Sequence, residues 1–164
     1  MLGCHKELRS SHVESRIRRQ RICCAAIPRA CANLLYLTYD PCMPCDCELD
    51  LERRWVRARA WGAVTYDEVM ATRRKFTSDP EFTPYFCQLY DGRDVTRLAL
   101  TASQVGELAR ATLFGPGSRR AFVAPTRETY GVVRLFKIYR EINAGREKID
   151  LFRSIEEAEA WLAG

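Results

Sequence analysis

The pattern of apolar and polar positions predicts a β-hairpin near residues 47–62. Apolar and polar side chains alternate from Cys47 to Leu51, a polar turn follows at 52–54, and alternation resumes from Trp55 to Trp61. A period of two is typical of a strand with one buried face. On the second strand it places the large side chains on one face, namely Trp55, Arg57, Arg59 and Trp61. The opposite face carries only small or short side chains, so we expect a helix to pack closely on it.

Four segments have the periodicity and the start signals of amphipathic helices. Three begin with a capping box, a Ser or Thr followed three residues later by Glu or Gln, at Thr65-x-x-Glu68, Thr101-x-x-Gln104 and Ser154-x-x-Glu157. The first helix should end near Ser78, because the residue before Pro80 is biased out of the helical region. The second is expected to continue to Phe114. The fourth helix is predicted from about Thr126 to Asn143.

Three short apolar runs separate these helices and have the length of buried strands: Phe86–Tyr90, Ala121–Ala124 and Ile149–Phe152. The element order is therefore β-β-α-β-α-β-α-β-α. Regular alternation of strand and helix favours parallel pairing with right-handed crossovers. We predict the α/β class, with a mixed, mainly parallel five-stranded sheet and helices packed on it, over residues 43–164.

The first 42 residues differ in composition from the rest. Seven of the eight cysteines lie in the first 47 residues, and so do both histidines. The partly apolar run Ile22–Tyr39 is broken by Pro28 and Arg29, which disfavours a signal peptide or a membrane span. The run Arg16–Arg21 is basic, but it lacks interleaved aromatic residues for nucleic acid. We expect residues 1–42 to be unstructured or to lie upstream of a true start at Met43.

The net charge and the cysteine content narrow the classes of partner that the protein could bind. Twenty-six Lys and Arg against 21 Asp and Glu give a net charge of +5, which is too modest to predict a nucleic-acid partner. The body after Glu48 has a single cysteine, Cys87, which indicates a cytoplasmic protein rather than a disulfide scaffold. The irregularly spaced cysteines Cys42, Cys45 and Cys47 are a weak match to a metal site. We expect no metal, no cofactor and no membrane span.

Candidate chemistry in the body is sparse. It contains no histidine, so it cannot form a Ser-His-Asp triad, a Cys-His dyad or a site with a histidine ligand, and we expect no enzymatic activity. Polar residues that follow a central strand often line a binding crevice in α/β sheets. On this basis we select a partner or ligand loop of two segments: Asp91, Arg93, Asp94, Thr96, Thr101 and Ser103, with Gly115, Gly117 and Ser118 as a second, anion-binding turn. The alternative is that the carboxylates pair with neighbouring arginines and the glycines only turn the chain.

Three segments resemble the SpoIIAA-like family of STAS-type domains: FTPYFCQLYDGRDV (82–95), FGPGSRRAFVAP (114–125) and IDLFRSIEEAEAWL (149–162). The resemblance covers about residues 43–164. It implies a small, cytosolic, non-enzymatic module whose fold is similar to anti-sigma factor antagonists and, more distantly, to CRAL-TRIO lipid-carrier domains. In the antagonist branch the phosphorylation switch is a Ser or Thr directly after an Asp at a helix N-terminus. This chain has no such pair at that cap. Thr101 is the positional counterpart, and its capping box explains it without a kinase.

Two functions of different classes follow. The first is a regulatory module that binds a protein partner through Asp91–Thr101 and the second predicted helix. The alternative is a carrier or sensor of a small apolar or lipid-like ligand, held between the sheet and the helix that carries Tyr130, Val133, Phe136 and Tyr139. A sizeable apolar cavity under that helix would favour the ligand, whereas an exposed apolar patch beside the second helix would favour a partner. The oligomeric state is open and includes a homodimer.

Overall fold

The computed structural model describes residues 44–164, and it gives them the order of strands and helices that the sequence predicts. The expectations for residues 1–42 and for a start at Met43 lie outside the described residues. The elements are β1 (Cys45–Asp50), β2 (Trp55–Thr65), α1 (Tyr66–Thr77), β3 (Cys87–Ala99), α2 (Ala102–Arg110), β4 (Arg119–Val123), α3 (Arg127–Ile142), β5 (Lys148–Phe152) and α4 (Ile155–Ala163).

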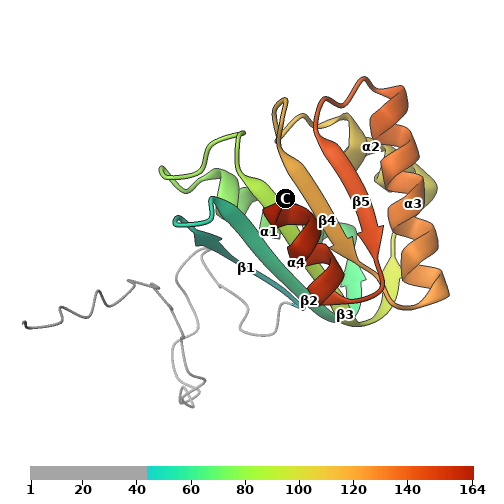
Figure 1. Cartoon of the computed structure of the whole chain (residues 1–164). Helices are drawn as coiled ribbons and strands as arrows, with labels where there is room; N and C mark the ends of the chain where they lie inside the picture. The colour runs from blue at the N-terminus through green and yellow to red at the C-terminus, as the bar shows by residue number, and fades with distance from the viewer. Residues whose placement is uncertain (1–43) are drawn as a thin grey trace, which may run out of the picture. The chain divides into compact units, whose positions relative to one another are not determined.

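The five strands form one mixed sheet in the order β1-β2-β3-β4-β5, as the sequence predicts for the α/β class. Only β1 and β2 are antiparallel, and the other three neighbouring pairs are parallel. Each parallel strand lies beside the next one in the sequence. Helices α1, α2 and α3 connect these strands on one face of the sheet, whereas α4 lies on the other face (Figure 1).

Successive side chains of the central strands point to opposite faces of the sheet, and a hydrophobic core lies on each face. In β4, Ala121 and Val123 pack with Ala158 and Leu162 of α4, whereas Phe122 between them packs with α2 and α3. The small face of β2 receives α1, as predicted. Val56 is fully buried there against Phe76 of α1.

Strand β3 is longer than the sequence predicts. The sequence predicts that it ends at Tyr90 and that Asp91 and Thr96 lie in a loop, but the strand runs to Ala99 and contains both residues. Strand β4 pairs with β3 only from Gln88 to Asp91, and the rest of β3 pairs with β2 alone. The extension exists because β2 is also long, and that pairing cannot be seen from the local sequence of β3.

Helix α2 is shorter than predicted, because it ends at Arg110 rather than near Phe114. Two carbonyl groups of its last turn bind arginines from other helices. Arg73 Nη1 donates to the Leu108 oxygen at 2.9 Å, and Arg140 Nη1 donates to the Ala109 oxygen at 2.7 Å. Carbonyl groups at a helix C-terminus lack amide partners, and cations there are stabilising. The helix therefore ends where arginines of other helices donate hydrogen bonds to its last carbonyl groups.

Candidate functional site

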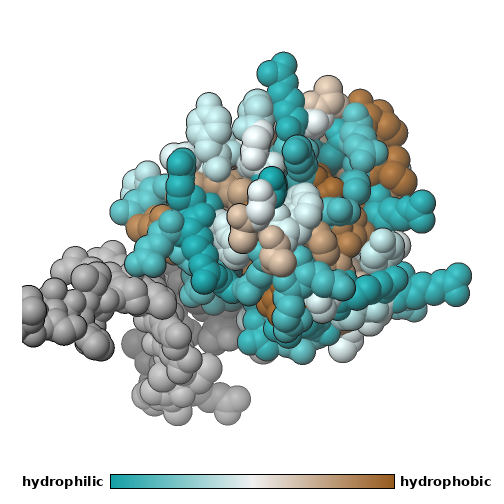
Figure 2. Space-filling model, viewed as in Figure 1, coloured by the Kyte–Doolittle hydropathy of each residue, from teal (hydrophilic) through white to brown (hydrophobic). Residues whose placement is uncertain are grey.

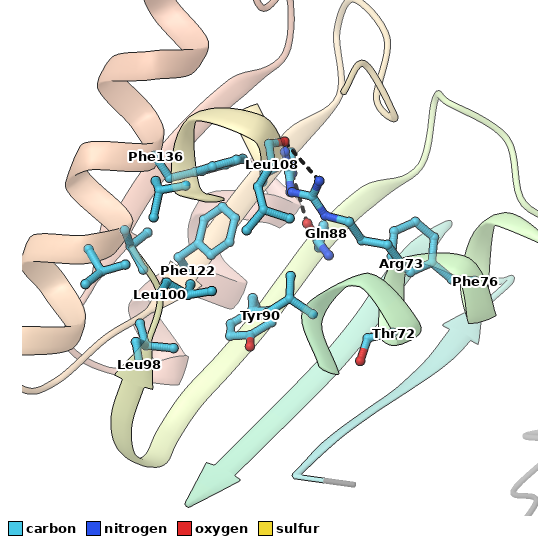
Figure 3. A pocket seen from close by; sticks show the side chains of 15 residues that line it. Thr72, Arg73, Phe76, Gln88, Tyr90, Leu98, Leu100, Leu108, Phe122 and Phe136 are labelled. Carbon is cyan, nitrogen blue, oxygen red and sulfur yellow. Dashed lines mark hydrogen bonds between the residues drawn. The ribbon is translucent and has the colours of Figure 1, made fainter. Parts of the chain in front are cut away.

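A cavity of about 80 Å³ lies between the sheet and the three helices on one of its faces (Figure 3). Its lining comes from α1, β3, α2, β4 and α3 and is mostly apolar, including Val69, Phe76, Val105, Leu108, Phe122 and Phe136. The polar residues of the lining are Thr72, Arg73, Gln88, Tyr90 and Arg120. The site thus combines an apolar wall with two arginines.

The register of β3 and β4 sets where polar and apolar groups lie in the cavity. Gln88 lies beside Arg120, and two residues further on Tyr90 lies beside Phe122, on the same face of the sheet. The rings of Tyr90 and Phe122 lie 5.7 Å apart between centroids. Leu98 follows towards the end of β3. The amino ends of these strands therefore carry the polar end of the cavity, and their continuation is apolar.

The apolar end is the more open one. Val69 of α1, Leu98 and Leu100 at the end of β3, and Val132 and Val133 of α3 line the cavity and are only partly buried. At the other end, Gln88 and Arg120 are 4% exposed. A group that enters between α1 and α3 therefore meets apolar side chains first and Arg120 last.

Arg120 is a buried cation enclosed by aromatic rings. Its guanidinium carbon lies 4.7, 5.3 and 5.1 Å from the ring centroids of Phe114, Phe122 and Phe136. Its Nε donates to Gln88 Oε1 at 2.9 Å, and its Nη1 lies 3.5 Å from Glu147 Oε1. Burial lowers the pKa of Arg120, and the neighbouring charge of Arg73 lowers it further, but a guanidinium stays protonated at neutral pH.

Arg73 also lies at the polar end, and it has no carboxylate partner among the described residues. Figure 3 shows its side chain extending from α1 towards Leu108, to which it makes its hydrogen bond. Burial lowers the pKa of Arg73 to about 10, the charge of Arg140 acts in the same direction, and the Tyr66 and Tyr90 hydroxyls oppose it. The group is a cation held in a partly desolvated place.

A third arginine, Arg140, shares the buried carboxylate of Glu147 with Arg120. Arg140 on α3 is 2% exposed and binds Glu147 through both oxygens. Burial alone would raise the pKa of Glu147, but the hydrogen bonds from Arg140 and the charges of Arg120 and Arg140 hold it below its usual range. Glu147 thus lies against two guanidinium groups, whereas Arg73 has no acidic partner among residues 44–164.

The structure places only half of the predicted apolar pocket residues at this cavity. Val133 and Phe136 line it, whereas Tyr130 and Tyr139 do not. Tyr130 lies under the guanidinium of Arg153, 4.2 Å from it, and Tyr139 lies against Gly106. The inward stripe of α3 continues from Phe136 to Arg140, one helical turn on. Hydrophobicity alone could not identify that stripe, because its last member is charged.

The two aspartates expected at the end of β3 are paired with arginines of the same chain. The side chain of Arg93 donates to both oxygens of Asp91 at 2.9 Å, and Arg59 donates to Asp94 at 2.6 Å. Thr101 forms its capping box with Gln104. Thr96 and Ser103 are exposed. The pairing agrees with the alternative interpretation, in which the carboxylates bind arginines of the same chain.

The second segment of that predicted loop lies at the opposite end of the parallel strands. Gly115, Gly117 and Ser118 precede β4, and Gly115 N donates to the Pro84 oxygen at 2.7 Å, ahead of β3. Ser118 is 1% exposed, and its hydroxyl donates to the Gly115 oxygen at 2.5 Å. Gly117 has φ +85°, which suits glycine in a tight turn. The two segments therefore do not form one site, because they flank opposite ends of parallel strands.

The described cysteines are packing residues. Cys45 and Cys47 are buried on β1, and burial raises the pKa of both thiols, that of Cys47 to about 11. A neutral thiol is a poor nucleophile and a poor metal ligand. Within residues 44–164, no group of three or more His, Cys, Asp and Glu side chains is placed to hold a metal ion.

Comparisons with models of known families, with curated proteins and with solved structures found no match to this chain. Among residues 44–164, no helix has both the length and the apolar character needed to cross a bilayer.

Proposed function

We propose that residues 44–164 form a non-catalytic module that binds a small ligand with an apolar body in the cavity beneath α3. The observation that carries the proposal is the cavity itself, which has an apolar, partly open end and a lining drawn from three helices and two strands. Ligand sites in proteins are concave, mostly apolar and equipped with a few placed polar groups. The cavity has each of these properties.

The size of the cavity supports a ligand rather than a packing defect. Protein interiors contain few voids larger than a water molecule, and one water needs roughly 10–15 Å³. The cavity measures about 80 Å³. An apolar cavity of roughly 150 Å³ stays dry and binds benzene. We infer that a group of a few heavy atoms enters fully, and that the rest of the ligand lies along the partly buried residues between α1 and α3.

The other predicted function, docking of a protein partner on Asp91–Thr101 and α2, stays a prediction. The buried residues of α2 are Val105, Leu108 and Ala109. The exposed large apolar side chains on helices are instead Ile138 and Ile142 of α3, and Figure 2 shows apolar surface over that helix. By the criterion stated for the sequence, the apolar cavity under α3 supports the ligand. The SpoIIAA-like resemblance stays a proposal too, and the lipid-carrier relatives that it implies agree with this choice.

A titration with a neutral apolar probe tests the proposal. In ¹H–¹⁵N NMR spectra of the full-length chain, 1-hexanol should give saturable shifts confined to the cavity lining. The variant Val133→Phe should abolish them, because the added ring fills the cavity from α3. The matched control Ile138→Phe adds a similar ring to the exposed side of the same helix and should leave binding unchanged. Unsaturable shifts, or equal binding by Val133→Phe, would contradict the proposal.

A further inference from the structure

The cavity holds more positive charge than a purely apolar ligand requires. Arg73 and Arg120 both line it, and both lie against the same ring, with guanidinium carbons 5.9 and 5.1 Å from the Phe136 centroid. Two cations in one partly desolvated place repel each other and lose hydration, which costs free energy unless an anion pairs with them. Glu147 lies within ion-pair distance of Arg120, at 3.5 Å, but it is already bound through both oxygens by Arg140.

At the polar end of the cavity, the hydrogen bonds of Arg73 and Arg120 use only some of their guanidinium N–H donors. Arg73 donates through Nη1 to Leu108, and Arg120 donates through Nε to Gln88. A guanidinium has five N–H donors in a planar fork that suits a carboxylate or phosphate. Arg73 has no carboxylate in ion-pair contact among the described residues. The polar end of the cavity therefore offers positive charge, N–H hydrogen-bond donors and shelter from water to a bound anion.

We propose that the ligand is a small organic acid, whose carboxylate binds between the guanidinium groups of Arg73 and Arg120 while its apolar body lies along Tyr90, Phe122 and Phe136 towards the open end. This inference rests on the proposed function, because it assumes that a ligand occupies the cavity. It adds the chemical class of that ligand and the direction in which it lies. The carboxylate supplies the acidic partner that Arg73 lacks among the described residues.

The test compares two probes that share one apolar body, hexanoate and 1-hexanol, on the full-length chain. Dissociation constants are measured by NMR titration at pH 7. Hexanoate should bind at least about tenfold more tightly, which is typical of a charge-assisted hydrogen bond in a sheltered site. The variant Arg73→Met should remove this preference for hexanoate over 1-hexanol, and Arg73→Lys should restore part of it. The matched control Arg74→Met changes the same charge at the neighbouring, exposed position of α1 and should have no effect.

The possible results of this test distinguish failure of the proposed function from failure of the present inference. If neither probe binds, the proposed function fails together with this inference. If 1-hexanol binds and hexanoate is no tighter, or if Arg73→Met keeps the preference, the proposed function stands and the inference is overturned. Inorganic phosphate is the third probe. Binding as tight as that of hexanoate, with the same shifts, would overturn the organic acid in favour of a free anion. Arg73 is varied because Arg120 also contacts Glu147, whose charge its loss would unbalance.

Discussion

Arg140 and Glu147 form a buried, two-pronged ion pair, in which Nε donates to Oε1 at 2.9 Å and Nη2 donates to Oε2 at 2.8 Å. The pair joins the end of α3 to the residue just before β5, and its carboxylate also lies 3.5 Å from Arg120. Both side chains are at most 2% exposed. Glu147 therefore compensates charge on two buried cations at once.

Replacement of that carboxylate should be strongly destabilising. Glu147→Gln leaves Arg140 and Arg120 without their negative partner, and breaking a buried pair costs about 3–5 kcal/mol. The free energy of unfolding is measured by urea denaturation. Glu141→Gln on the exposed side of α3 is the control and should change it by less than about 0.5 kcal/mol. Equal effects of the two substitutions would show that Glu147 does not hold the cluster together.

The same pair predicts how stability depends on pH. Hydrogen bonds and charges hold the pKa of Glu147 below its usual range, despite burial. Stability from this group is therefore fully present above the unfolded pKa of about 4.3 and is lost as the pH falls through the lower folded value. Unfolding free energies of the wild type should drop between about pH 5 and pH 2 more steeply than those of Glu147→Gln. Parallel curves would contradict a lowered pKa.

Two glycines, one inside α3 and one just after it, should respond to alanine with opposite signs. A Cβ at Gly145 would lie 3.0 Å from Nε, Nη2 and O of Arg140, so Gly145→Ala must displace the ion pair. We expect a loss of about 1–3 kcal/mol. A Cβ at Gly131, inside α3, meets nothing within 4 Å. Gly131→Ala should therefore raise stability by about 0.5–1 kcal/mol. Thermal unfolding of both variants checks the signs, and a stabilised Gly145→Ala would refute the close approach to Arg140.

The two aspartates of β3 should differ in their importance to the fold. The Asp91 side chain is 12% exposed and binds Arg93 through both oxygens, whereas the Arg59–Asp94 pair is 64% and 54% exposed. Asp91→Asn should cost about 1–3 kcal/mol because it weakens a partly buried, charge-assisted pair. Asp94→Asn should cost less than about 1 kcal/mol, as is usual for surface pairs. Chemical denaturation of both variants measures this, and a larger loss in Asp94→Asn would reverse our ranking.

Two of the fifteen residues that line the cavity were selected as pocket residues from the sequence. Val133 and Phe136 were selected because they are apolar residues of an amphipathic helix, and both line the cavity. Arg73, Arg120 and Arg140 were missed, because a charged residue within an apolar pattern is usually interpreted as exposed. The only signal in the sequence was the position of these arginines within the periodic pattern of their strand or helix. Arg120 falls on the same face of β4 as Phe122, and Arg140 falls on the stripe of Phe136.

The sequence by itself determined the elements, their order and most of their starts. The N-caps Thr101 and Ser154 begin helices as predicted, because a cap joins groups only three residues apart. The tertiary structure alone decided where β3 and α2 end and which charges are buried. Strand β3 continues because β2 lies beside it, and the last carbonyls of α2 bind arginines 35 and 31 residues away. Partners at such separations meet only when the chain has folded, so no local pattern encodes them.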